Sequence, residues 1–188
     1  LFRLLENTKP SRVNIRSLEE YHRQFTFPVR LYYERAGVTD DIFDDVAHAW
    51  MAEYERCMDT IPLHEDASET VERFHQAGLR QTVLSASEQT MLRRQLALYG
   101  LNNRFDAILG RGDIYAGSKE AIGREYLQNC GIPAEATVMI GDSLHDAEVA
   151  RALGTVTVQA PVAIGDVVLR DVCGTGVDVT AAKNMEKI

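Results

Sequence analysis

Two aspartates four residues apart, Asp142 and Asp146, follow a short apolar run at residues 138–140. A continuous apolar run of this kind is typical of a strand that helices bury on both faces. Asp142 would then stand at the carboxyl end of a strand, where open α/β sheets bind ligands, with Asp146 about one helical turn further on. Two such carboxylates suit Mg²⁺, which takes one or two protein carboxylates and fills its other positions with water or phosphate. The alternative is that Asp142 or Ser143 only caps the following helix and that Asp146 complements the helix dipole.

Two further side chains, Ser85 and Lys119, stand where a strand gives way to a helix. The helix after Ser85 offers free N–H groups and the positive end of its dipole, which together favour a bound anion. Ser85 and Glu88 also have the spacing of a capping box, and Ser87 is an acceptable N-cap, so capping is an equal alternative. Lys119 begins a helix, where the dipole disfavours a cation unless an anion lies nearby. Taken alone, Lys119 is more simply interpreted as a solvated surface lysine, because most lysines are exposed.

Hydrophobic periodicity predicts the elements that would position these residues. Residues 1–66 show only helical spacing of apolar side chains, and no strand is predicted there. Beyond residue 66 helix and strand patterns alternate, which predicts a parallel sheet covered by helices on both faces. The predicted helices are 68–77, 88–99, 119–129, one after Asp142, and 166–172; the predicted strands are 79–84, 106–109, 138–140, 155–158 and 177–179. The chain is therefore predicted to have an all-helical part, 1–66, and an α/β part, 67–188.

The composition narrows the class of protein. The formal net charge of -8 argues against a nucleic-acid groove and against an anionic membrane surface as partner. No apolar run approaches the roughly 20 residues of a membrane-spanning helix, and no secretory signal is recognisable. Cys57, Cys130 and Cys173 form no CxxC pair, which favours reduced thiols and a cytoplasmic location. We expect a small-molecule substrate and a monomer or homodimer.

Ser85, Lys119 and the run Gly141–Asp146 occur in the order and spacing of three motifs of the haloacid dehalogenase-like (HAD) hydrolase superfamily, which the sequence resembles. Residues 69–154 are most similar to its phosphoglycolate-phosphatase-like branch. The resemblance implies a Rossmannoid parallel-sheet core at 67–188 and an all-helical cap at 1–66. It also implies a Mg²⁺-dependent phosphatase of a small phosphorylated metabolite that acts through an aspartyl-phosphate intermediate. The implied site consists of phosphate-binding Ser85, Ala86 and Lys119, of which Ser85 and Lys119 are catalytic, and of metal-binding Asp142 and Asp146.

One motif of the superfamily is missing from the sequence. The DxDxT run, which carries the nucleophile and the general acid on the first core strand, does not occur in the 188 residues. We therefore expect the nucleophile and the first core strand upstream of Leu1. Glu120 follows Lys119, where the family often has proline. Other aspartates do not substitute for the nucleophile, because none of them follows a buried strand with a third motif residue in place. The aspartates considered are Asp40, Asp41, Asp44, Asp45 and Asp113.

The missing strand leads to a geometric prediction. In the superfamily this strand lies between the strands that here end at Ser85 and Gly141. Those two strands would therefore stand about two strand spacings apart, roughly 9 to 10 Å, without pairing to each other.

Several alternatives stay open for the function and for substrate recognition. A non-catalytic HAD-like binding or regulatory protein would lack the nucleophile altogether. A phosphosugar mutase or a dehalogenase would belong to the same superfamily, although a dehalogenase would need no Mg²⁺. The candidate substrate contacts in the helical part, for which helix packing or solvation is the simpler interpretation, are His22, Arg30, Tyr32, Tyr33 and Arg35.

Overall fold

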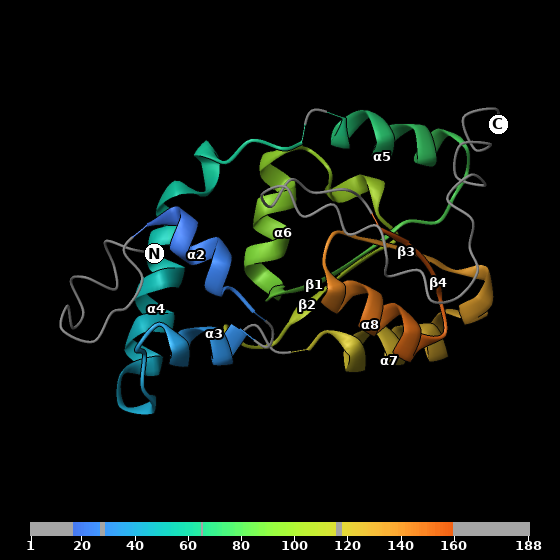
Figure 1. Cartoon of the computed structure of the whole chain (residues 1–188). Helices are drawn as coiled ribbons and strands as arrows, with labels where there is room; N and C mark the ends of the chain where they lie inside the picture. Colours follow the sequence, from blue (N-terminus) through green and yellow to red (C-terminus); the bar gives the residue numbers. More distant parts are fainter. Residues whose placement is uncertain (1–16, 27–28, 65, 116–117, 160–188) are drawn as a thin grey trace. The chain divides into compact units, whose positions relative to one another are not determined.

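A computed structural model of the protein describes residues 17–26, 29–64, 66–115 and 118–159 (Figure 1). The chain divides into two compact units, residues 1–132 and residues 133–188. Both units contain helices and a pair of parallel strands, as the α/β prediction requires. The predicted domain boundary at residue 66 falls inside the first unit, and that division into cap and core stays a prediction.

The amino-terminal part of the first unit is helical. Its elements are α2 (Leu18–Gln24), α3 (Val29–Arg35), α4 (Asp40–Cys57) and the 3-10 turn η1 (Met58–Thr60). Ser17 begins α2 by accepting a hydrogen bond from the Glu20 amide at 3.1 Å, which satisfies one free donor of the first turn. The apolar face of α4 packs into a buried cluster formed by Val38, Ile42, Phe43 and Val46. No strand occurs among the described residues before position 66, as the sequence predicted.

The rest of the first unit contains a parallel strand pair. Its elements are α5 (Ala67–Gln76), β1 (Thr82–Glu88), α6 (Gln89–Leu98), η2 (Asn102–Arg104), β2 (Ala107–Arg111) and α7 (Glu120–Cys130). The register runs from Thr82 opposite Ala107 to Leu84 opposite Leu109, and pairing resumes only at Glu88. The sequence predicted that the first strand ends at Leu84. The structure extends it to Glu88 across this irregularity.

Helix α6 connects the helical part to the strand pair. Gln95 Nε2 donates to Tyr54 Oη at 2.6 Å, and the Tyr99 hydroxyl donates to the Ile61 carbonyl. The same helix packs against β1 and β2, and Figure 1 shows it between α4 and these strands. The helices that were predicted as a cap therefore lie in one compact unit with the first strand pair.

The second unit contains the other strand pair. Its elements are η3 (Ala134–Ala136), β3 (Val138–Gly141), α8 (Leu144–Leu153) and β4 (Val156–Gln159). β3 and β4 run parallel, from Val138 opposite Val156 to Gly141 opposite Gln159. Gly154 ends α8 with φ of 74°, the left-handed conformation that glycine adopts without strain. The predicted helix 166–172 and strand 177–179 lie outside the described residues.

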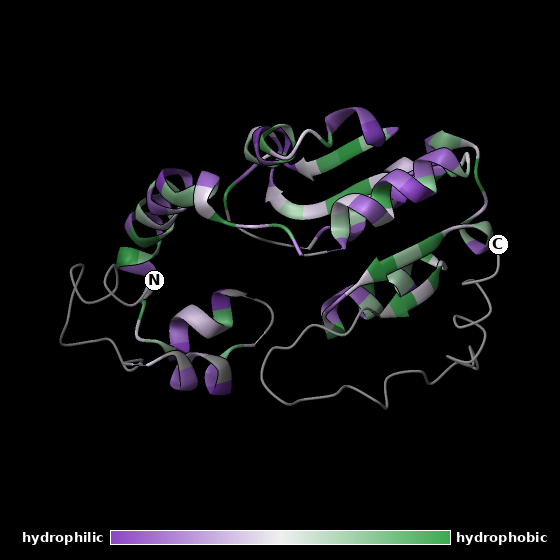
Figure 2. Ribbon diagram, turned by 90° about the horizontal axis from the view of Figure 1, so that it is seen from above, coloured by the Kyte–Doolittle hydropathy of each residue, from purple (hydrophilic) through white to green (hydrophobic). Residues whose placement is uncertain are grey.

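The four described strands form two separate pairs, β1 with β2 and β3 with β4. The predicted spacing of the strands that end at Ser85 and Gly141 stays a prediction. Figure 2 shows hydrophobic residues concentrated on the strands, whereas the helices alternate between hydrophobic and hydrophilic faces. β3 leaves two apolar side chains exposed, Val138 at 51% and Ile140 at 55%. None of the helices in the described part is long and apolar enough to cross a membrane.

Candidate active site

Ser85 lies within β1, in the irregular stretch between Leu84 and Glu88, which we call the Ser85 turn and which precedes α6. This helix is capped by Glu88, whose carboxylate accepts hydrogen bonds from the amides of Thr90 and Met91, each at 2.8 Å. These bonds, the one from Thr90 first, hold the pKa of the Glu88 carboxyl below its usual value. The capping alternatives for Ser85 and Ser87 are therefore wrong. Ser85 Oγ accepts instead from the Ser87 amide at 3.1 Å, and its hydroxyl proton suits a phosphoryl oxygen.

The Ser85 turn is held against β2 by the first residue of α6. Gln89 Oε1 accepts from the Gly110 amide at 2.6 Å, and Gln89 Nε2 donates to the Ile108 carbonyl at 3.1 Å. A Cβ at Gly110 would lie 2.7 Å from Gln89 Cα and 2.9 Å from the Ser87 carbonyl oxygen. Only glycine fits here, because these neighbours are backbone atoms. Sequence reasoning missed this close approach, for which a glycine within a strand was the available signal.

Lys119 reaches the same turn from the start of α7. It directly precedes this helix, and its half-buried Nζ donates to the Leu84 carbonyl at 3.3 Å. Although 35 residues separate Lys119 from Leu84, the contact sets an ammonium group beside the Leu84–Ser85 peptide. The structure thus brings Lys119 to the part of β1 that carries Ser85 and Ala86, the other two residues predicted to bind phosphate.

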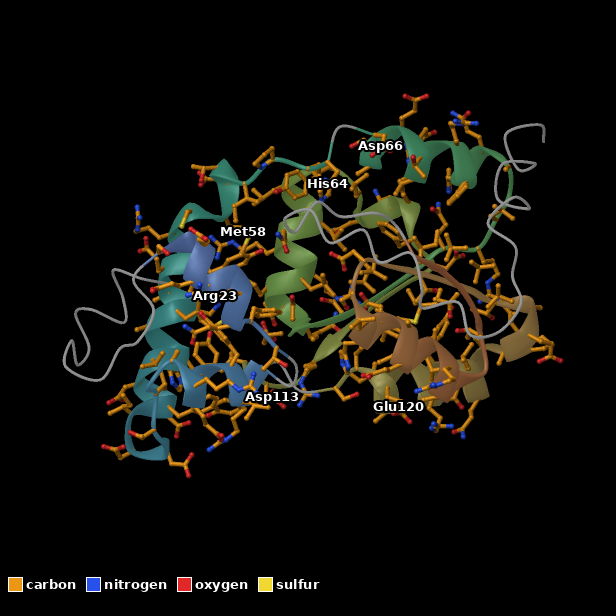
Figure 3. The ribbon with its side chains drawn as sticks, viewed as in Figure 1. Arg23, Met58, His64, Asp66, Asp113 and Glu120 are labelled. Carbon is orange, nitrogen blue, oxygen red and sulfur yellow. The ribbon has the colours of Figure 1, made fainter. Side chains whose placement is uncertain are left out.

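Arg111, the last residue of β2, is hydrogen-bonded to the segment that leads from β2 to Lys119. The Arg111 guanidinium donates to both carboxylate oxygens of Asp113, at 3.2 and 2.6 Å, and to the Ser118 carbonyl at 2.8 Å. The hydrogen bond from Arg111 is the main cause that lowers the pKa of the Asp113 carboxyl. Figure 3 labels Asp113 in the segment after β2 and Glu120 in the first turn of α7. This Arg111 clamp was not predicted, and its only signal in the sequence is the i, i+2 spacing of two opposite charges.

In the second unit, the Asp146 side chain takes part in capping α8. The side chain is buried, at 7% exposure, and Oδ2 accepts from Ser143 Oγ at 2.7 Å, from the Ser143 amide at 3.1 Å and from the Asp142 amide at 3.2 Å. Ser143 Oγ in turn accepts from the Asp146 amide at 3.2 Å, which completes a capping box. The prediction that Ser143 could cap this helix is therefore confirmed, and Asp146 is its partner in the box, which was not predicted. The metal-binding role of Asp146 stays a prediction.

Gly141 makes room for this buried carboxylate. A Cβ at Gly141 would lie 2.3 Å from Asp146 Cβ and 2.6 Å from its Cγ, so the aspartate packs directly on the glycine backbone. Asp142, the next residue, is exposed. One aspartate of the pair is therefore fixed by the fold, and the other is presented at the surface of this unit.

The two aspartates fit Mg²⁺ by their donor chemistry. Carboxylate oxygens are the ligands that this hard cation takes, commonly one or two per site, with water and substrate oxygens at the other positions. Within the described residues, no group of three or more His, Cys, Asp or Glu side chains is placed to hold a metal ion. Asp142 and Asp146 therefore suit a partial ligand set. That these aspartates form one site with Ser85 and Lys119 stays a prediction.

A cavity of about 560 Å³ lies beside the Ser85 turn within the first unit. Ser85, Ala86 and Ser87 line one part of it, and aromatic rings line most of the rest. We call it the aromatic cavity; its rings belong to Tyr21, Phe25, Tyr32, Tyr33, Phe43, Trp50, Tyr54 and Tyr115.

Two of the candidate substrate contacts in the helical part line this cavity, and two do not. Tyr32 and Tyr33 line it, whereas Arg30 and Arg35 are not among its lining residues. Arg30 lies over the Phe43 ring, 4.5 Å from its centroid, and forms an ion pair with Asp40. The side chain of His22 lies outside the described part of the chain.

Residues 3–160 match the family of haloacid dehalogenase-like hydrolases. The chain belongs to this family. The matched span includes the described helices of the amino-terminal part and both strand pairs, so it covers all five predicted HAD site residues. A comparison with curated proteins gives no significant match.

Solved structures of HAD-like proteins share the fold of this chain. A predicted phosphatase from Clostridium acetobutylicum superposes with a TM-score of 0.73 at 15% identity, covering 98% of this chain and 90% of that one. A HAD-like family hydrolase from Streptococcus pneumoniae has a TM-score of 0.71 at 15% identity, covering 84% and 73%. A predicted phosphoglycolate phosphatase from Haemophilus somnus has a TM-score of 0.66 at 17% identity, covering 84% and 76%. The HAD-like α/β fold predicted from the sequence is therefore confirmed.

Proposed function

We propose that this HAD-like protein is a Mg²⁺-dependent phosphatase of a small phosphorylated metabolite. The observation that supports the proposal best is the hydrogen bond from Lys119 Nζ to the Leu84 carbonyl, because it sets a cation beside the Ser85 turn. An ammonium group, a hydroxyl and backbone amides ahead of a helix together provide the donors that a phosphoryl group requires. The family membership of the chain supports hydrolase chemistry at this place.

Each residue has a distinct role in this proposal. Ser85 and the Ala86 backbone hold phosphoryl oxygens, and Lys119 offsets the negative charge on the phosphoryl group during transfer. Asp142 and Asp146 hold Mg²⁺, which when bound supplies further charge stabilisation to the phosphoryl oxygens. Asp146 also orients Asp142, since its carboxylate accepts from the Asp142 amide. The aromatic cavity receives the leaving group and keeps water away from it.

The proposed reaction passes through an aspartyl-phosphate. A carboxylate oxygen attacks phosphorus, the bond from phosphorus to the leaving oxygen breaks, and that oxygen takes up a proton. Water then attacks the phosphorus, which releases inorganic phosphate and regenerates the carboxylate. Because the 188 residues contain no DxDxT run, the proposal includes a nucleophilic aspartate from outside them.

Phosphate release by the native protein tests this function. Release from a panel of phosphate monoesters should require added Mg²⁺ and should stop when EDTA is present. Lys119→Ala should lower kcat/KM by about 10²-fold, as expected when a charge-stabilising donor is removed. The matched control is Arg124→Ala on the same helix, because Arg124 is exposed and pairs with Glu120 at the surface. Unchanged turnover in Lys119→Ala would contradict the assigned role.

The same assay separates the alternatives. A non-catalytic binding protein would bind inorganic phosphate without releasing it from any ester, and an intact mass of the native protein near 21.0 kDa would support that alternative. A phosphosugar mutase would return a rearranged phosphosugar in place of free phosphate. The proposed state of monomer or homodimer is read from the molar mass in solution by light scattering.

A further inference from the structure

The aromatic cavity has a lining that disfavours a polar leaving group. Eight of its lining residues are aromatic, and Met51, Met91 and Ala47 add apolar surface. The one charged residue among the described lining is Glu88, and its carboxylate already caps α6. No lysine, arginine or histidine occurs in that lining, so a second anionic group on the substrate would find no cation there. A bisphosphate or a phosphorylated carboxylic acid therefore fits this wall poorly.

The rings of the cavity support one another. Tyr32 contacts Tyr21 edge-on at 5.3 Å between centroids, Phe25 at 5.3 Å and Tyr33 at 5.7 Å. Tyr33 continues the series to Phe43 at 6.0 Å. Side chains packed in this way lose little freedom when a ligand binds, because their rotamers are already fixed. The cavity wall is thus preorganised for a flat apolar group.

One polar atom in this wall lacks a partner. Tyr32 is 1% exposed, and its hydroxyl has no hydrogen-bond partner among the described residues. Burial first, and then the neighbouring Tyr21 and Tyr33, raise the pKa of this hydroxyl, so it stays a neutral donor. Because this hydroxyl is closed off from solvent, Tyr32 offers the cavity its ring and not its oxygen.

We propose that the aromatic cavity binds a flat aromatic ring, so that the preferred substrate is an aryl phosphate monoester. Its phosphoryl group lies at Ser85, and its ring lies against the aromatic rings of the cavity. Hydrolysis breaks the bond between phosphorus and the aryl oxygen; water supplies the hydroxyl group to phosphorus and the proton to the phenol that leaves. The reaction rests on the proposed phosphatase function, whereas binding of the ring does not.

Trp50 makes the ring binding measurable without turnover. It is the only tryptophan of the chain and lines the aromatic cavity, so its fluorescence reports on this cavity alone. The native protein is titrated with phenylphosphonate, a stable aryl probe, and with methylphosphonate as the matched probe without a ring. We expect phenylphosphonate to bind at least about 10-fold more tightly, because the ring adds stacking and apolar burial.

Two variants test the wall and the hydroxyl separately. Ala47→Leu narrows the cavity and should weaken phenylphosphonate binding while methylphosphonate binding stays unchanged. Tyr32→Phe keeps the ring and removes only the buried hydroxyl, so the preference for phenylphosphonate over methylphosphonate should stay unchanged. Tyr99→Phe, which lies outside the described cavity lining, is the control for loss of a tyrosine hydroxyl. If Ala47→Leu fails to fold, the comparison of the two phosphonates on the native protein still decides the point.

The outcomes distinguish this inference from the proposed function. Phosphate release from glycerol 3-phosphate as fast as from phenyl phosphate, with equal binding of the two phosphonates, would overturn the aryl preference and leave the phosphatase intact. Tight phenylphosphonate binding with no phosphate release from any ester would refute the phosphatase and leave the ring site standing.

Discussion

The two strand-to-helix connections that carry predicted site residues both have to cap the helix that follows, and they do so with different side chains. After β1, the helix is capped by Glu88, three positions beyond the predicted phosphate ligand Ser85. After β3, the cap is the Ser143–Asp146 box, in which Ser143 is the N-cap and the predicted metal ligand Asp146 is its partner. Stability and proposed chemistry are therefore carried by separate residues in the Ser85 turn and by the same residue in the acidic turn. This difference leads to four predictions.

Gly110→Ala should have the largest effect on stability, because it breaks the support of the Ser85 turn. The added methyl group would meet Gln89 Cα at 2.7 Å and the Ser87 carbonyl oxygen at 2.9 Å, and backbone atoms yield little. We expect a loss of about 3 kcal/mol in the free energy of unfolding, at the upper end for overpacking. The matched control is Gly112→Ala, where no atom lies within 4 Å and the change should stay within about 0.5 kcal/mol. Urea denaturation measures both; equal losses would contradict the close approach.

Asp146→Ala should come second, since it removes the box from the acidic turn. Its carboxylate accepts three hydrogen bonds from Ser143 and Asp142, so the variant should lose about 2 kcal/mol of unfolding free energy. Asp142→Ala, at an exposed position, should stay within about 0.5 kcal/mol. Both variants should lose the Mg²⁺-dependent phosphate release. A stable Asp146→Ala protein would show that capping and proposed metal binding are separable here as well.

Glu88→Ala should lose about 1 kcal/mol at neutral pH, the usual value for an N-cap. Hydrogen bonds from Thr90 and Met91 depress the pKa of this carboxyl in the folded state. Its stabilisation is therefore complete above the unfolded-state pKa of about 4.3 and is lost as the pH falls through the folded-state value. Unfolding free energies of wild type and variant should converge towards pH 3. Exposed Glu125→Ala on α7 is the control, and the same pH-dependent difference there would point to a general charge effect.

Ser85→Ala should have the smallest effect on stability, within about 0.5 kcal/mol, because among the described residues its hydroxyl accepts only from the neighbouring Ser87 amide. Its turnover should nevertheless fall by about 10²-fold if Ser85 binds the phosphoryl group. Exposed Ser68→Ala on α5 controls for the loss of a serine hydroxyl. A drop in stability as large as that of Glu88→Ala would mean that Ser85 shares the cap after all.

Local patterns predicted most of the fold, and contacts between distant residues account for what they missed. Apolar periodicity and the glycines at 78, 100, 131 and 154 located helices α5 to α8 and strands β2 to β4 within a few residues. The continuation of β1 past Leu84 was not predicted, because it depends on Gln89 bonding to a glycine 21 residues away. The same holds for the Arg111 clamp and for the aromatic cavity, whose rings come from three separate helices, from Phe25 just after α2 and from Tyr115 after β2.

The contact between Gly141 and Asp146 also constrains how this sequence can diverge. The nearest atom to a Cβ at position 141 would be Asp146 Cβ itself, at 2.3 Å, so shortening residue 146 to alanine makes no room. Only glycine at 146 would make room, and glycine carries no carboxylate. Related sequences can therefore keep an acid at 146 or gain a side chain at 141, but not both on this backbone. Positions 141 and 146 are therefore expected to vary together, and a homologue with alanine at 141 should lack the aspartate at 146.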